Sequence, residues 1–530
     1  MVGDFLHNVS PKNSFLSGVS ALTLSTVVVK IIGLVYKIPM MRILGAEGMG
    51  YFNAAYELYT LFFVMATAGL PVAVSVLISE NLARGRDGNA KKIYRVSFAL
   101  FLMLGLAGTL ALGVGAGLLS TWIGTQNARL SIACIAPTVL LVATASAVRG
   151  YFQGNQNMMP TAVSQVVEAV GKLVFGVLLA AFAVRIGWSV AEASALAVLG
   201  LVAGSALSVI YLLFRVSALR RNKTPRGGTT EPAGRILKSL LSLAIPVTAG
   251  ACLSGFTRIV DMTLILRRLP ALGFDATEAA TAFGQYSTLA VPIYHLPTAL
   301  MAGIAVSLVP TLAAAVESGQ RDRQRDLIGT SLRLCALVSV PCAFGLALFS
   351  EPILSLLFAG EREAVSVASP LLASLGASVP SACLLGVTNA VLQANRREAF
   401  PILSMLTGLA VKGASGYLLM GLPAVGMMAA PVSTLLGNLA AVGLNFWMIG
   451  RCGAYEGGLL AILARPALPC VIAMSAALGI YLPFAESDRR TIAFAVALVA
   501  CGVVYFPIAR LVGALEKQDV SVLLKRKQKE

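Results

Sequence analysis

Charged side chains inside long apolar stretches are the strongest chemical signal in this sequence of 530 residues. Burying a charge away from water is costly, so such a side chain is retained when it pairs with an opposite charge, faces a wet cavity or binds a ligand. Six cations outnumber three acids, which leaves about three positive charges without an acidic partner and predicts a binding site for an anion. These residues are Lys30, Lys37, Arg42, Lys172, Arg258 and Lys412, with Glu57, Glu168 and Asp261.

Two pairs of these charges stand at helical spacing. Glu168 and Lys172 are four residues apart and Arg258 and Asp261 are three apart, so each pair shares one face of a helix. Two interpretations are open for both pairs. Each is either an internal ion pair of a helix bundle or a group that binds a ligand or couples to an ion.

Lys30 has no carboxylate three or four residues away, and for this residue an anion-binding role is the favoured interpretation. Lys37 follows two helical turns later on the same face. Arg42 is expected to extend its side chain toward the outer membrane interface. Glu57, in the next apolar stretch, is a candidate partner or coupling acid.

His295 stands between Pro292 and Pro297. Two prolines so close together are expected to break the helix and to expose backbone groups that could gate a cavity. A buried histidine bonded to a neighbouring carbonyl is favoured over a proton-coupling histidine.

Motifs for catalysis or metal binding are missing from the sequence. It has no Walker A pattern, nucleophile elbow or HExxH motif, and its eight cysteines form no CxxC pair. We therefore predict neither an ATPase nor a hydrolase, and no cofactor or metal.

The elements that must position the charges are transmembrane helices. Hydrophobic residues make up 57% of the chain and charged residues 12%, and the mean hydropathy is +0.82, which excludes an ordinary soluble domain. The N-terminus lacks the pattern of a cleaved signal peptide. We predict an all-α polytopic membrane protein with about 14 spans. The predicted spans are residues 15–43, 51–80, 96–119, 130–151, 160–184, 193–215, 239–266, 282–315, 327–350, 366–393, 400–420, 426–449, 459–482 and 491–513.

The distribution of Lys and Arg orients these spans. Loops assigned to the inside hold about four times as many as loops assigned to the outside, which predicts that both termini are cytoplasmic. Arg149, near the end of the fourth span, is counted with the inside residues. The net charge of +17 then faces anionic lipid headgroups, and no nucleic-acid partner is predicted.

The longest polar interruption divides the chain. We predict an N-terminal lobe of helices 1–6 (residues 1–215), a cytoplasmic linker (216–238), a C-terminal lobe of helices 7–12 (239–450), and two further helices with a basic tail (451–530). Gln153-Gly154-Asn155 is echoed by Gln393-Ala394-Asn395 at corresponding positions. Repeats offset by six spans keep one orientation, so the lobes should be related by an axis along the membrane normal.

Five blocks of residues resemble a known family. They are Lys30-Ile31-Ile32-Gly33, Arg42 to Tyr51, Ala68-Gly69-Leu70-Pro71, Arg149 to Gly154 with Met159-Pro160-Thr161, and Pro292 to Pro310. In this order they resemble the polysaccharide-biosynthesis branch of the MOP (MATE-like) exporter superfamily. More narrowly, the chain is similar to the stage V sporulation protein B group and to lipid II flippases of the MurJ type.

The resemblance implies two six-helix lobes around a cationic cavity of alternating access, and two final helices that help to form an apolar groove. The implied substrate is an undecaprenyl-diphosphate-linked sugar, typically lipid II. Lys30, Arg42 and Arg258 match basic positions of the family, whereas Lys37 stands near a position where the family often has Arg. A lysine there keeps a point charge but loses the bidentate grip of arginine on phosphate.

The leading hypothesis is therefore a flippase, not an enzyme, in the bacterial plasma membrane, acting in cell-wall or spore formation. An exporter of another lipid-linked oligosaccharide, a MATE-like cation or drug antiporter, and a non-transporting scaffold are the alternatives. Expected partners are the polyprenyl-diphosphate-linked sugar, membrane lipids, a coupling ion such as Na⁺ or H⁺, and the cell-wall synthesis machinery.

Overall fold

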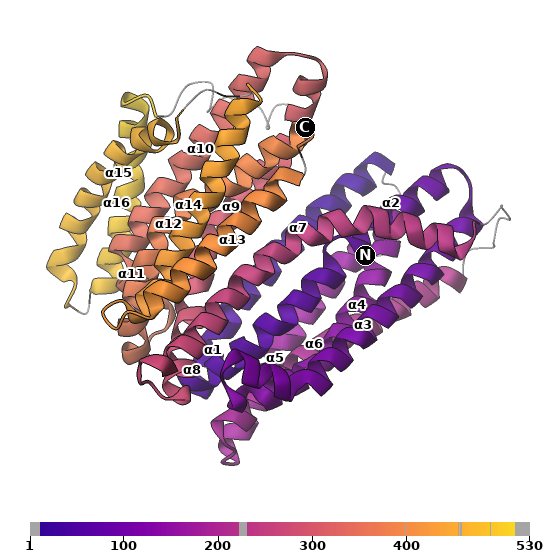
Figure 1. Ribbon diagram of the computed structural model, residues 1–530, viewed down its shortest axis with the longest axis horizontal. Coiled ribbons are helices and arrows are strands. Elements are labelled where there is room, and N and C mark those ends of the chain that lie inside the picture. Colours follow the sequence, from indigo (N-terminus) through magenta and orange to yellow (C-terminus); the bar gives the residue numbers. More distant parts are fainter. Residues whose placement is uncertain are drawn as a thin grey trace, which may run out of the picture. The chain divides into compact units, whose positions relative to one another are not determined.

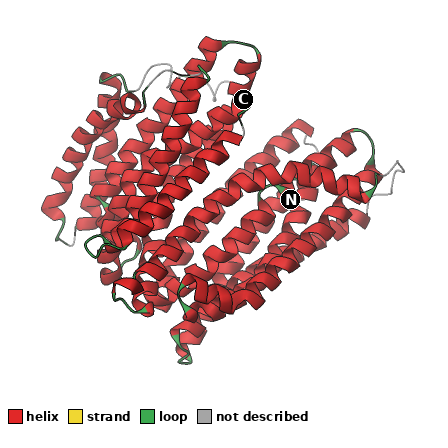
Figure 2. Ribbon diagram, in the orientation of Figure 1, coloured by secondary structure: helices red, strands yellow, loops and turns green. Residues whose placement is uncertain are grey.

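Helices make up the fold, and no strand occurs in the part of the chain that the computed structural model describes (Figures 1 and 2). That part is residues 11–221, 231–397, 399–453, 455, 458–487 and 489–514. The predicted all-α class is confirmed. The α-helices are α1 (Pro11–Thr67), α2 (Leu70–Ala83), α3 (Asp87–Ile123), α4 (Arg129–Gly154), α5 (Met159–Arg185), α6 (Val190–Arg221), α7 (Ala233–Arg268), α8 (Ala276–Gln285), α9 (Val291–Glu317), α10 (Arg321–Leu348), α11 (Ser350–Leu357), α12 (Arg362–Ala394), α13 (Ala399–Met420), α14 (Ala429–Arg451), α15 (Leu459–Tyr481) and α16 (Arg490–Leu511).

Thirteen helical segments among the described residues are long and apolar enough to cross a membrane. The first of them, Leu24–Ala83, contains residues 24–43 of the first predicted span and the whole of the second, 51–80. Gly45 separates these two with φ 67° and ψ −178°, a conformation that glycine adopts without the steric penalty of a Cβ atom. Helix α1 is therefore two helices that meet at a kink, and α2 follows it after a short break at Ala68 and Gly69.

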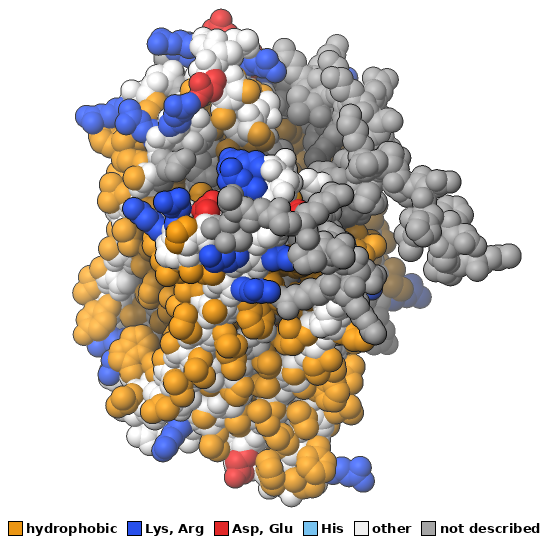
Figure 3. Space-filling model, turned by 90° about the vertical axis from the view of Figure 1, so that its right-hand side faces the viewer, with side chains coloured by type: hydrophobic (Ala, Val, Ile, Leu, Met, Phe, Trp, Pro, Cys, Tyr) orange, Lys and Arg blue, Asp and Glu red, His pale blue; other side chains and the backbone are white. Residues whose placement is uncertain are grey.

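The surface matches a membrane environment. Figure 3 shows one face on which hydrophobic side chains form a broad band, with Lys and Arg side chains gathered above it. On α3, Val114 is 83% exposed and Leu118 is 80% exposed. Side chains this apolar and this exposed are suited to lipid contact rather than to water.

The chain divides into two compact units, residues 1–270 with 274–284, and residues 271–273 with 285–530. In the first unit, α7 packs against α1, α2 and α3, so the seventh helix lies with helices of the predicted N-terminal lobe. Of the predicted linker, residues 216–221 belong to α6 and residues 233–238 to α7. Residues 222–230 lie outside the described residues.

Glycines allow α5 and α6 to approach closely within the first unit. A Cβ atom on Gly204 of α6 would lie 2.6 Å from the Glu168 carbonyl oxygen and 2.6 Å from the Lys172 nitrogen of α5. A Cβ atom on Gly200 would lie 2.3 Å from the backbone of Gly176. Since real Cβ contacts are longer, this backbone contact requires glycine and fixes the register of the two helices.

In the second unit, α15 and α16 pair with each other and α15 packs against α10 (Figure 1). Leu337 and Phe349 share a buried cluster with Cys470 and Tyr505. The Tyr505 hydroxyl donates a hydrogen bond of 2.8 Å to the carbonyl oxygen of Leu337. The two final helices are thus built into the core of their unit.

The expected helix break at Pro292 and Pro297 is wrong. Helix α9 runs unbroken from Val291 to Glu317, and the irregularity lies just before it, in a π-helical turn over Tyr286–Ala290. Pro292 directly follows this π-helical turn, which fits a proline whose ring disturbs the preceding turn of the helix rather than the turn after it.

Candidate functional site

Two groups of charged side chains lie within the first unit. We call Arg149, Glu168 and Lys172 the triad, and Lys37, Glu57, Arg258 and Asp261 the α1–α7 cluster. The triad joins α4 to α5, and the α1–α7 cluster joins the two helices after which it is named.

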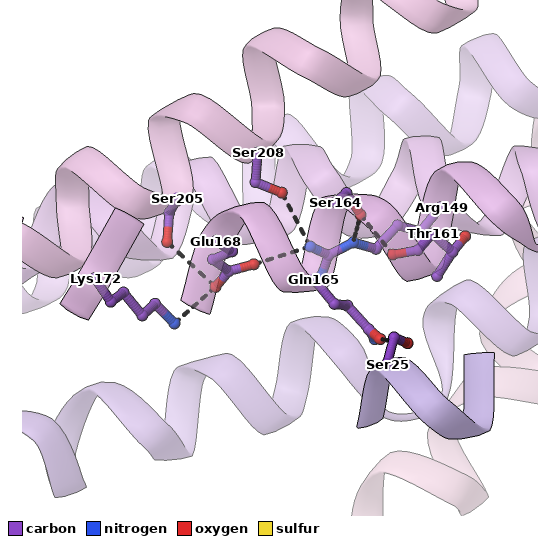
Figure 4. Close-up of polar contacts among 9 residues, drawn as sticks. All are labelled: Ser25, Arg149, Thr161, Ser164, Gln165, Glu168, Lys172, Ser205 and Ser208. Carbon is purple, nitrogen blue, oxygen red and sulfur yellow. Dashed lines mark hydrogen bonds and ion pairs between the residues drawn. The ribbon is translucent and has the colours of Figure 1, made fainter. Parts of the chain in front are cut away.

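One carboxylate connects the two cations of the triad (Figure 4). A guanidinium nitrogen of Arg149 lies 2.8 Å from Glu168 Oε2, and Lys172 Nζ lies 2.7 Å from Glu168 Oε1. The side chains of Arg149 and Glu168 are 9% and 8% exposed, while that of Lys172 is 23% exposed. The ion pair that the spacing of Glu168 and Lys172 allowed is thus formed, with a third member from α4.

Serine hydroxyls complete the hydrogen bonds of the triad. Arg149 donates from Nε to Ser164 Oγ at 2.9 Å and from Nη2 to Ser208 Oγ at 3.0 Å. Ser205 of α6 donates to Glu168 Oε1 at 3.3 Å. Figure 4 shows that these side chains converge on the triad from α5 and α6. Such bonds are what a buried charge needs to be tolerated.

Arg149 was missed by the reasoning from sequence, which counted it with the inside residues. The structure buries it in α4 and pairs it with Glu168, so Arg149 belongs among the candidate site residues. A signal was present, because Arg149 falls within the predicted span 130–151. Polar Ser164, Ser205 and Ser208 also interrupt the apolar stretches that follow.

The α1–α7 cluster pairs residues from distant parts of the chain. Arg258 Nε lies 3.1 Å from Glu57 Oε2, so Arg258 forms an ion pair with α1 that its spacing from Asp261 did not predict. Lys37 and Asp261 are also close enough to act electrostatically on Glu57. Asp261 is 8% exposed. Two cations face two acids here, and the cluster is formally neutral.

The other predicted site residues are distributed over both units. Lys30 and Arg42 are exposed on α1 of the first unit. Lys412 is buried, at 3% exposed, on α13 of the second unit. His295 is exposed on α9 with its ring centre 5.0 Å from that of Tyr294, so the expectation of a buried histidine is wrong. Its neighbours Ile293 and Tyr294 occupy the buried face of that turn.

Among the described residues, no group of three or more His, Cys, Asp or Glu side chains is placed to hold a metal ion. The Lys and Arg side chains of the two charged groups are of the types that pair with carboxylates and bind anions.

Two family models match the chain. The model described as "Polysaccharide biosynthesis protein" matches residues 15–316, and the model described as "MatE" matches residues 287–418. The first match covers more than half of the 530 residues.

Two curated relatives and one solved structure are similar to this chain over most of its length. The Lipid II flippase MurJ of Bacillus subtilis (strain 168) is 25% identical over 538 residues, which cover 95% of this chain and 96% of that protein. Stage V sporulation protein B of the same organism is 25% identical over 431 residues, which cover 80% and 82%. The structure described as "Lipid II flippase MurJ, inward closed conformation" aligns with a TM-score of 0.69 at 14% identity, over 96% of this chain and 99% of that one.

The two MurJ proteins are named as flippases rather than enzymes, and they resemble this chain along nearly its whole length. The 13 candidate spans agree with a multi-pass protein of the plasma membrane. With its family model matched over more than half of its residues, the chain belongs to the polysaccharide biosynthesis protein family.

Proposed function

We propose that this protein is a flippase that moves a polyprenyl-diphosphate-linked cell-wall precursor from the inner to the outer leaflet of a bacterial plasma membrane. Lipid II is the leading substrate. The observation that carries the proposal is the excess of cations within the membrane-spanning helices of a chain whose relatives include a lipid II flippase. A diphosphate offers the negative charge that such cations would neutralise.

In this proposal the substrate-binding cations are Lys30, Lys37, Arg42, Arg258, Lys172 and Lys412. The groups for ion pairing or coupling are Glu57, Glu168, Asp261 and His295. Arg258 is the strongest candidate for a two-pronged contact with phosphate, because a guanidinium presents paired N–H donors. Its ion pair with Glu57 would hold its side chain in place, and its other N–H donors would face the ligand.

Movement, not bond chemistry, is what the proposed function requires. Both termini are cytoplasmic in this proposal, and the lobes at residues 1–215 and 239–450 rock about the linker in alternating access. One charge that crosses the membrane field is worth about 2.3 kcal/mol per 100 mV. Outward movement of a diphosphate past a negative-inside potential is thus favourable, and Na⁺ or H⁺ would serve to reset the carrier.

The test is complementation of bacteria that are depleted of their own lipid II flippase. We expect the full chain to restore growth and cell shape, and Lys30→Ala and Arg258→Ala to fail while reaching the membrane at normal levels. Lys92→Ala, on α3 and outside both charged groups, is the matched control and should restore growth. If the wild-type chain inserts correctly but does not restore growth, lipid II is not the substrate.

Two other functions have specific support. The description of the matched family favours another lipid-linked oligosaccharide, which would be found by repeating the assay in strains that lack an exporter of such a unit. The MatE match over residues 287–418 favours a cation or drug antiporter. Efflux of a cationic dye that is lost in Asp261→Asn would support that function.

A further inference from the structure

We propose that the triad is an anion-binding subsite for the diphosphate, in which Lys172 contacts the ligand and Arg149 is a positioning residue. The inference deepens the proposed function and rests on it. The inference adds two points to the sequence-based prediction. It includes Arg149, which was not among the predicted site residues, and it assigns an excess positive charge to one group of side chains.

The charge of the triad does not balance. Two cations share one carboxylate, at 2.8 Å and 2.7 Å, which leaves a net charge of one positive unit in a largely buried place. The ionisable groups that act on Lys172 are Glu168, Tyr56 and Arg149, and those that act on Glu168 are Lys172 and Arg149. Tyrosine is neutral near pH 7, so it does not change the sum.

The α1–α7 cluster differs in this respect, since its two cations face two acids. Of these two charged groups among the described residues, the triad is therefore the one with an uncompensated positive charge. An isolated positive charge among apolar helices is expensive, and an anionic ligand that reaches it gains the missing counter-charge.

Lys172 is the member that can reach a ligand. Its side chain is 23% exposed, against 9% for Arg149. Arg149 donates hydrogen bonds from Nε to Ser164 and from Nη2 to Glu168 and Ser208. An ammonium has more donors than the single carboxylate contact of Lys172 uses. Tyr56, which is 37% exposed and acts electrostatically on Lys172, can add a hydroxyl donor beside it.

Arg149 acts through Glu168. As long as Arg149 holds Glu168 Oε2, the carboxylate is shared and Lys172 keeps attraction for a second anion. Without Arg149, Glu168 and Lys172 become a neutral pair four residues apart. Loss of Arg149 should then weaken anion binding although this side chain does not touch the ligand.

The test measures binding of undecaprenyl diphosphate to the purified full chain in lipid nanodiscs, with undecaprenol as the uncharged comparison. We expect Lys172→Gln to lower affinity for the diphosphate about tenfold or more, a change of about 1.4 kcal/mol. Arg149→Gln should lower it to a similar extent, and Arg149→Lys should retain most of it. Lys92→Gln, a partly buried lysine on α3, is the matched control and should bind as the wild type does.

The decisive variant is the double substitution Arg149→Gln with Glu168→Gln. It restores a net charge of one positive unit on Lys172, so affinity should return to within about threefold of wild type. If Arg149 were needed only for packing, the double variant would bind no better than Arg149→Gln. That result, or wild-type binding by both single variants, would overturn the proposal. Inorganic pyrophosphate is then added as a competitor of undecaprenyl diphosphate. Competition means that the diphosphate group alone is sufficient for binding, and no competition means that the lipid is also required; the site is compatible with both results.

The outcomes separate this inference from the proposed function. If the wild-type chain binds no undecaprenyl diphosphate, the proposed function itself fails. If the wild type binds, Arg258→Gln abolishes binding and the triad variants do not change it, the function stands and the subsite is wrong.

Discussion

Replacing Glu168 by Gln removes the carboxylate that Arg149 and Lys172 share, and it leaves two cations facing each other across the α4–α5 contact. Breaking a buried ion pair in this way costs about 3–5 kcal/mol, and a pair of unit charges 4 Å apart at an effective dielectric constant of 20 gives a similar value, about 4 kcal/mol. Because Lys172 is 23% exposed and water screens part of its charge, we expect about 3–4 kcal/mol.

The assay is thermal unfolding of the full chain in detergent, followed by the loss of the monodisperse peak in size-exclusion chromatography. One kcal/mol corresponds to about 2–4 °C in a domain of 150–250 residues, so Tm should fall by about 6 °C or more. Glu80→Gln, on an exposed residue of α2, is the control and should leave Tm unchanged. Adding Arg149→Gln removes the repulsion and should recover part of the loss. A Glu168→Gln protein as stable as the Glu80→Gln control, or no recovery in the double variant, would refute this account of the triad.

Three further predictions concern other contacts. Gly204→Ala places a Cβ atom 2.6 Å from the backbone of α5, so we expect a loss of about 1–3 kcal/mol, visible as a lower Tm in the same assay. Glu57→Gln and Arg258→Gln should each lower the free energy of unfolding, but the double variant should lose less than the sum of the two single losses. Additive losses would mean that the ion pair at 3.1 Å contributes nothing to stability. Tyr505→Phe removes the hydrogen bond to Leu337 and should cost about 1 kcal/mol of stability while growth in the complementation assay is unchanged.

Hydropathy was sufficient to predict the class of the fold and most of the spans, because a bilayer permits only apolar segments long enough to cross it. The kink at Gly45 and the π-helical turn before α9 were not predicted. The kink rests on a positive φ that apolar periodicity does not reveal. The effect of Pro292 was misplaced because a proline disturbs the turn before it, and the π-helical turn lies there.

In the candidate site, only contacts between residues close together in the sequence were predicted. Glu168 and Lys172 are four residues apart, and their pair follows from helix geometry alone. The contact of Glu57 with Arg258 joins helices that are far apart in the chain, and that of Arg149 with Glu168 joins neighbouring helices through a turn. The charges in apolar segments indicated that these side chains need oppositely charged partners. Which partner each side chain contacts depends on the packing of α1 with α7 and of α4 with α5.

The triad also bears on how the chain enters the membrane during its synthesis. Arg149 and Glu168 are carried by successive helices, α4 ending at Gly154 and α5 beginning at Met159. A lone charge at the centre of an inserting helix costs about 2.5–3.5 kcal/mol. Helix α4 would bear up to this cost for Arg149 if it left the translocon by itself, whereas α5 already pairs Glu168 with Lys172. As a hairpin, the two helices enter the lipid with the charges already paired. The ion pair therefore favours insertion of α4 and α5 as one unit, before α6 arrives to supply Ser205 and Ser208.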